Sequence, residues 1–287
     1  MSEFDATPAE EFEEIPDLQP RSIENRYERR ITMRVPDRHN EKLQRLMEWV
    51  NENDDLYALW IASNVTAIER LGMTDHGPVH VKIVTNLALR LLRLLMDAGI
   101  EPGVMKSYGL GQDDAEVVVA LGALLHDIGM SIHRANHEEY SLFLASEQLR
   151  RLPEELYPPR VAAILRSEVL HAIIGHRSGG RPLTLEAGVV RIADALDMAK
   201  GRSRIPFEAG SVSIHSVSAA AVERVILEPG EEKPVRISIE INNSAGIFQL
   251  DQLFREKFKG SGLEPHLELR AFMKEESERR LFRQFTL

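Results

Sequence analysis

The chain has 287 residues, of which 43% are hydrophobic and 28% charged, a composition typical of a globular protein with a sizeable hydrophobic core. It contains no cysteine, which excludes disulfide bonds, thiolate metal ligands, iron–sulfur clusters and cysteine nucleophiles. Its 35 Lys and Arg and 45 Asp and Glu residues give a net charge of -10, which argues against sequence-independent binding of long nucleic acid. Because the chain has no cysteine, any metal ion must be held by histidine and carboxylate side chains.

The N-terminal segment, residues 1–36, holds four prolines and many Glu and Asp residues, without clear apolar periodicity. This pattern predicts a flexible acidic tail. The first residues lack the basic and then apolar order of a signal peptide. The longest apolar runs, such as Val117–Leu125, have about half the length that a bilayer-spanning helix needs. We therefore expect a cytoplasmic protein that makes no contact with a membrane.

The central part of the chain, from about residue 38 to residue 200, has apolar residues at helical spacing. Breaks at Gly and Pro residues divide it into segments. The segment 100–112 is rich in glycine and is predicted to be a loop. Asn136 is predicted to cap the helix that follows it, with Glu139 in the reciprocal position. The pattern predicts seven helices, at 38–53, 54–72, 78–99, 113–129, 136–152, 159–176 and 183–200.

The C-terminal part has a different pattern, with alternating and β-branched residues that are typical of strands. We expect a helix over residues 245–260. Strands are predicted at 211–217, 224–228, 235–241 and 266–273. The sequence therefore predicts a small α+β domain over 211–287, after a helical domain over 37–205.

Three polar residues, His80, His126 and Asp194, lie on the buried faces of three predicted helices. Each shares its face with apolar or small residues: Val84, Leu87 and Leu91 for His80, Val119, Gly122 and Ala123 for His126, and Ala187 and Val190 for Asp194. The pair His126–Asp127 follows an apolar segment and is costly to bury unless it is paired or bound to a metal. The alternative is a helix end whose polar residues meet solvent. One metal ion inside the bundle would explain all three positions.

The ordered set of His80, His126–Asp127 and Asp194 resembles the H…HD…D pattern of the HD-domain metal-dependent phosphohydrolases. The segment LLHDIG is similar to the HDIG form of that family. Residues 173–197 resemble the stretch that carries the later histidine and the last aspartate in its HD-GYP branch. The resemblance covers residues 72–200. It implies a mainly α fold, an HD-domain helical bundle, to which the predicted C-terminal α+β domain is added.

The resemblance also implies roles for six residues. A first divalent metal would be held by His80, His126, Asp127 and Asp194. Asp127 would bridge to a second metal and take the central catalytic role, and His137 and His176 would complete the second position. His171 competes with His176, because five residues correspond to about 140° around a helix and the two face one centre only if the helix ends between them. We favour His176. The ligand types suit one or two ions of Mn, Fe, Co, Ni or Zn.

Positive groups near these ligands are candidates for contacts with a substrate phosphate. Lys200 and Arg202 follow the helix of Asp194, and each could instead be a solvated surface cation. His76 lies one turn before His80, where it could contact a phosphate or simply begin the helix. We assign His76, Lys200 and Arg202 as the candidate substrate-binding residues.

The function implied by the resemblance is hydrolysis of a phosphoester in a nucleotide or other small phosphorylated metabolite, by metal-activated water. We expect a homodimer, no long nucleic acid and no membrane partner. The GYP signature is absent, and Met130 and Arg177 depart from that branch, which argues against hydrolysis of cyclic-di-GMP. One alternative is a regulatory HD module that binds a nucleotide without turnover, with the C-terminal domain as sensor or partner surface. Another is a helical protein with incidental histidines.

Overall fold

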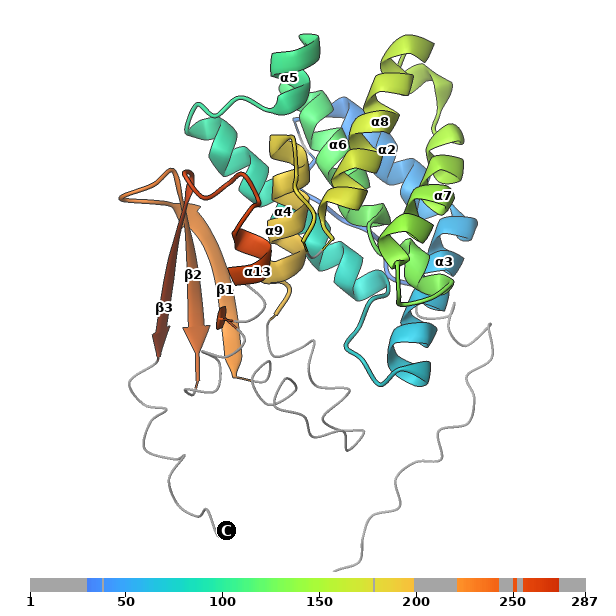
Figure 1. The fold of residues 1–287 in the computed structure, drawn as a ribbon. Helices are drawn as coiled ribbons and strands as arrows, with labels where there is room; N and C mark the ends of the chain where they lie inside the picture. Colours follow the sequence, from blue (N-terminus) through green and yellow to red (C-terminus); the bar gives the residue numbers. More distant parts are fainter. Residues whose placement is uncertain are drawn as a thin grey trace, which may run out of the picture. The chain divides into compact units, whose positions relative to one another are not determined.

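The computed structural model describes residues 30–37, 39–177, 179–198, 221–242, 250–251 and 255–273. From Thr32 onward these residues belong to one compact unit, which contains both the helical bundle and a small sheet (Figure 1). The α-helices are α2 (Glu41–Glu52), α3 (Asp54–Asn64), α4 (Pro78–Asp97), α5 (Gly103–Tyr108), α6 (Gln112–Leu125), α7 (His137–Arg150), α8 (Pro159–Gly175), α9 (Leu185–Leu196) and α13 (Arg255–Phe258). The strands are β1 (Val222–Pro229), β2 (Val235–Ile241) and β3 (Leu267–Met273). The predicted tail lies almost entirely outside the described residues.

The core of the bundle is formed by α4, α6, α8 and α9, which pack side by side (Figure 1). Helix α6 is buried over every residue from Asp114 to Leu125. A Cβ atom at Gly122 would lie 3.0 Å from Ala172 Cβ and 3.1 Å from Val190 Cγ2. The predicted small-residue face of α6 therefore lets α8 and α9 approach closely, which brings the ends of these helices together.

The seven helices predicted over residues 38–200 are confirmed, with differences at their ends. The predicted helix 245–260 lies partly outside the described residues, and its described part contains α13. Gly103–Tyr108, predicted as part of a loop, forms α5. Its first backbone N–H groups, of Gly103 and Val104, donate to the carboxylate of Glu186 over 3.0 and 2.9 Å. A buried carboxylate on α9 thus accepts from the first backbone N–H groups of α5, which have no partner within their own helix. Because Glu186 lies far away in the sequence, no local pattern predicts this contact.

Two further expectations about helix ends are corrected. Asn136 precedes α7, but its φ is 60° and its side chain makes no capping bond. Glu139 pairs with Arg177 instead of closing a capping box. Helix α9 ends at Leu196 rather than continuing to residue 200, and the side chain of Asp197 turns inward to bond with His80.

The sheet has the order β1-β2-β3, with β1 antiparallel and β3 parallel to β2. Leu227 pairs with Ile237, which in turn pairs with Leu269. The guanidinium of Arg90 on α4 donates to the carbonyl of Leu227, so β1 is tied to the bundle. The chain is therefore mainly α but not purely α. The predicted strand 211–217 and the boundary near residue 205 lie outside the described residues.

Among the described helices, none is both long enough and apolar enough to cross a membrane.

Candidate metal centre

Six polar side chains converge where the ends of the core helices meet. His80 comes from the first turn of α4 and Asp194 from the last turn of α9, while the others follow α6 and α8 or begin α7. All six were predicted as ligands: His80, His126, Asp127, His137, His176 and Asp194. Five of them are buried, and the Asp194 side chain is 16% exposed. Asp194 is therefore the most exposed of the six side chains.

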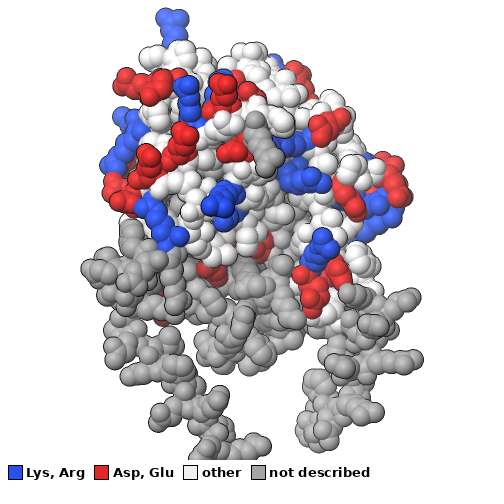
Figure 2. All heavy atoms as spheres, turned by 180° about the vertical axis from the view of Figure 1, so that it is seen from behind, with Lys and Arg blue, Asp and Glu red and all other residues white. Residues whose placement is uncertain are grey.

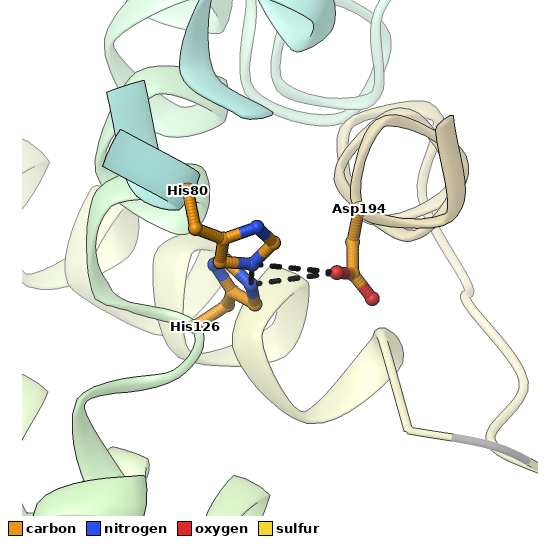
Figure 3. Close-up of side chains that lie close together, drawn as sticks. All are labelled: His80, His126 and Asp194. Atoms are coloured by element: carbon orange, nitrogen blue, oxygen red, sulfur yellow. Dashed lines mark hydrogen bonds and ion pairs between the residues drawn. The ribbon is translucent and has the colours of Figure 1, made fainter. Parts of the chain in front are cut away.

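The first group contains His80, His126 and Asp194, which face one another across a small gap (Figure 3). The two Nε2 atoms are 3.2 Å apart, and Asp194 Oδ1 lies 3.6 Å from His80 Nε2 and 3.7 Å from His126 Nε2. Asp127 Oδ2 lies 3.4 Å from both nitrogens. Ligands at about 2.1 Å from one ion are roughly 3.0–3.4 Å apart, close to these spacings.

The second group contains Asp127, His137 and His176. Asp127 Oδ1 lies 3.1 Å from His137 Nε2 and 3.7 Å from His176 Nε2. Its other oxygen faces the first group, so one carboxylate lies between both groups and presents one oxygen to each. This is the arrangement that a bridging ligand requires.

The histidine rings are oriented by bonds at their other nitrogen. His126 Nδ1 lies 2.7 Å from the carbonyl of Ala123, and His176 Nδ1 lies 2.5 Å from the carbonyl of Ile173. Because a carbonyl can only accept, Nδ1 of each ring must carry a proton, so that in the neutral form of the ring the Nε2 lone pair is directed into the group. His80 is fixed in the same way by Asp197, whose Oδ2 lies 2.6 Å from His80 Nδ1.

The turns that carry the ligands are tightly specified. Asp75 Oδ1 accepts from the backbone N–H of Gly77 and of His80, over 3.0 and 3.1 Å, and so fixes the start of α4. A Cβ atom at Gly129 would lie 2.0 Å from the carbonyl oxygen of His137. Only glycine therefore lets the turn after Asp127 contact the start of α7. This contact brings His137 to the carboxylate of Asp127.

The buried charges depend on one another. Burial lowers the pKa of His126, but Asp127 and Asp194 outweigh burial and raise it to about 10. Burial likewise raises the pKa of Asp127, but His126 and its neighbours bring it well below the usual range. Burial lowers the pKa of His176, and the adjacent His126 adds to this effect. The two carboxylates thus require positive charge beside them, which a divalent cation would supply as well as a proton does.

The comparisons with known proteins agree with this geometry. The family model of the HD domain matches residues 79–199, a range that includes all six side chains. An uncharacterized protein of Methanocaldococcus jannaschii is 43% identical over 225 residues, which cover 78% of this chain and 86% of that protein. The chain belongs to the HD domain family. HD domain proteins are in general metal-dependent hydrolases, and this HD domain has His and Asp groups that could hold metal ions.

Three further histidines, His76, His133 and His171, lie outside the two groups. His171 Nε2 accepts from the backbone N–H of Leu183 over 2.9 Å, so the structure places His176 rather than His171 beside Asp127. His133 is exposed and accepts from Ala135. His76 is buried, and its ring centroid lies 5.4 Å from that of His80, at the edge of the first group. Lys200 and Arg202 lie outside the described residues.

Three residues at the centre were not predicted. Asp197 orients His80, and its only sequence signal is a second aspartate three positions after Asp194. Lys257, in the C-terminal part, donates to Asp194 on α9. Arg191, also on α9, donates to the backbone carbonyl of Lys257. Neither cation is marked by a motif, because each acts through residues far away in the sequence.

A cavity of about 410 Å³ lies elsewhere in the HD domain, among α6, the end of α7, the short 3-10 segment Glu154–Leu156 and the first half of α8. Its walls are mainly apolar, with Leu121, Leu156 and Val169 among them. None of the six side chains lines it. Its lining residues contain no histidine and one carboxylate, that of Glu154, so they offer no set of metal ligands like those of the two groups.

Proposed function

We propose that this HD domain protein is a metal-dependent phosphohydrolase that cleaves a phosphoester of a nucleotide or another small phosphorylated metabolite. The observation that carries the proposal is the position of Asp127, which presents Oδ2 to one pair of histidines and Oδ1 to another. A carboxylate between two such groups fits a pair of ions about 3.5–4 Å apart, a spacing found in phosphoester-cleaving sites.

In this proposal each group holds one ion. His80, His126, Asp127 and Asp194 would hold the first, and Asp127, His137 and His176 the second. Imidazole and carboxylate ligands suit Mn, Fe, Co, Ni or Zn. Bound ions of this kind supply a Lewis acid for phosphoryl oxygens and lower the pKa of a coordinated water.

The chain's own residues orient the ligands and limit access. Asp127 holds the two groups together, and we assign it the central catalytic role. Asp194 lies at the more exposed edge, beside which a phosphate can approach. His76, Lys200 and Arg202 remain our candidates for contacts with that phosphate.

The surface supports a small substrate. Figure 2 shows that positive and negative side chains are interspersed on the face it presents, without one broad basic area. Long nucleic acid is bound chiefly through many phosphate contacts to clustered Lys and Arg. The net charge of -10 acts in the same direction. We keep the expectation of a homodimer as a prediction about the intact protein.

The test combines elemental analysis with turnover. We expect one or two transition-metal ions per chain in the wild type, with hydrolysis in a screen of nucleotides and generic phosphoesters. Asp127→Ala should lose both, whereas Asp113→Ala, an exposed aspartate in the first turn of α6, should lose neither. Metal without turnover across the screen would favour the regulatory module that binds a nucleotide. A wild type that binds no metal after reconstitution would exclude the proposed function.

A further inference from the structure

Lys257, in the C-terminal part of the chain, reaches the first group of the metal centre. We propose that it is a positioning residue: its ammonium holds one oxygen of Asp194 so that the other stays directed at His80 and His126. This inference rests on the proposed function, since it assigns a role at the same centre. It also gives the C-terminal part a place in the active site.

Lys257 contacts both groups of the metal centre. Its Nζ donates to Asp194 Oδ2 over 3.3 Å and to the carbonyl of His176 over 2.5 Å. The opposite oxygen, Asp194 Oδ1, faces the two Nε2 atoms at 3.6 and 3.7 Å. The ammonium therefore contacts the side chain of Asp194 in the first group and the backbone carbonyl of His176 in the second group.

Arg191 holds the backbone of Lys257 in place. Arg191, on α9 three residues before Asp194, is almost fully buried. Its Nε donates to the carbonyl of Lys257 over 2.7 Å, and its Nη2 donates to that of Glu256 over 2.9 Å. The same guanidinium donates to the carbonyls of Arg177 and Gly180 over 2.8 and 2.6 Å. Arg191 thus joins the backbone of α13 to the loop that follows α8.

Lys257 fixes the orientation of the Asp194 carboxylate. The side chains of Lys257 and Asp194 are each only 16% exposed, so water screens their attraction weakly. An ammonium that holds one oxygen of the carboxylate favours the orientation in which the other oxygen is directed at a metal. Without the ammonium, the Asp194 side chain can rotate and lose this orientation. Outer partners of this kind typically contribute 10–100-fold to metal affinity or activity.

The consequence is that the C-terminal part does not act only as a separate sensor or partner surface. Residue 257 lies beyond the match to the HD domain, which ends at residue 199. The α13 segment nevertheless places a cation on a ligand of the HD domain. We infer that the bundle and the C-terminal part form one functional unit.

The experiment uses the full chain with Lys257→Met, Lys257→Arg and the matched control Lys259→Met, an exposed lysine two residues further on. Mn²⁺ affinity and stoichiometry are measured by titration calorimetry. Co²⁺-loaded protein provides an absorption spectrum that reports the ligands around the ion. The melting temperature of the metal-free proteins separates an effect on the centre from an effect on folding.

We expect Lys257→Met to bind Mn²⁺ 10–100-fold more weakly than the wild type and to change the Co²⁺ spectrum. Lys259→Met should match the wild type, and Lys257→Arg should recover part of the affinity, because it keeps the charge but not the geometry. Equal affinity and equal spectra in Lys257→Met and Lys259→Met would overturn the inference while leaving the proposed function intact. Equal loss in both Lys257 variants, with a lower metal-free melting temperature, would assign Lys257 a structural role only. A wild type that binds no metal would overturn both proposals.

Discussion

Asp197 Oδ2 lies 2.6 Å from His80 Nδ1, although the two residues are 117 positions apart in the chain. Both side chains are buried, so the bond is shielded from solvent. It directs Nε2 of His80 toward His126 and Asp194. The carboxylate thereby sets both the tautomer and the direction of the first candidate ligand.

We therefore predict that Asp197→Asn weakens metal binding by about 10–100-fold while keeping the fold. The amide retains the size of the carboxylate but loses its charge, and it can present its NH₂ group to Nδ1 and favour the wrong tautomer. Titration with Mn²⁺ provides the measurement. Asp97→Asn, at the exposed end of α4, is the control and should bind as the wild type does. Unchanged affinity in Asp197→Asn would show that His80 is oriented without this bond.

Gly129 yields a prediction about stability. A Cβ atom there would lie 2.0 Å from the carbonyl oxygen of His137 and 2.4 Å from the backbone nitrogen of Ser141, so the start of α7 must move. We expect Gly129→Ala to lower the free energy of unfolding by at least about 3 kcal/mol, the upper range for overpacking. Urea denaturation of the metal-free protein measures this loss.

The control for that experiment is Gly111→Ala, because a Cβ atom at Gly111 meets its nearest neighbour at 3.6 Å, an ordinary contact. Its φ of -94° is accessible to alanine. We expect a loss of at most about 1 kcal/mol for this variant, because glycine is preferred to alanine at an N-cap. Similar stabilities in the two variants would mean that the contact between Gly129 and α7 is looser than described.

Much of the fold was predictable because most helices have one apolar face. Leu43, Leu46, Met47 and Val50 have the spacing of one helical face in the segment predicted as a helix over 38–53, and all four are buried in α2. The same periodicity placed His80 inside the bundle. Helix α5 was missed because the carboxylate that satisfies its first N–H groups belongs to Glu186, more than eighty residues away.

The candidate site was predictable only in part. Helical faces indicated His80, His126 and Asp194, while His137 and His176 depended on the resemblance to the HD domain. Asp197 and Lys257 could not be predicted, since they act on ligands from distant segments. Their positions depend on where α9 ends and on how α13 packs against it, which no local pattern encodes.

The sheet provides a prediction about pH. Glu268 accepts from Arg236 over 2.5 Å and from the backbone N–H groups of Glu231 and Glu232, and Arg236 is the main cause that lowers its pKa to about 2. Because the folded pKa lies below the usual value of about 4.3, this carboxylate stabilises the fold above that value. The contribution is lost as pH falls from about 4 toward 2.

The check compares urea midpoints of the wild type and Glu268→Gln. We expect a lower midpoint for the variant at pH 7 and a difference that shrinks steadily below about pH 4. Glu232→Gln, an exposed neighbour, should follow the wild type at each pH. A difference that stayed constant down to pH 2 would mean that the effect of the substitution does not come from the charge of Glu268.

Metal binding should also stabilise the folded chain. The two candidate groups combine side chains from α4, α9 and the ends of α6, α7 and α8, so an ion bound there ties together segments that separate on unfolding. At a free metal concentration 100-fold above Kd, linkage predicts about 2.7 kcal/mol of added stability per ion. We expect chelator to lower the melting temperature of the wild type and added Mn²⁺ to restore it. Asp127→Ala should melt at one temperature in both conditions, because its loss removes a ligand from each group. A chelator effect of equal size in the variant would place the stabilising ion outside these two groups.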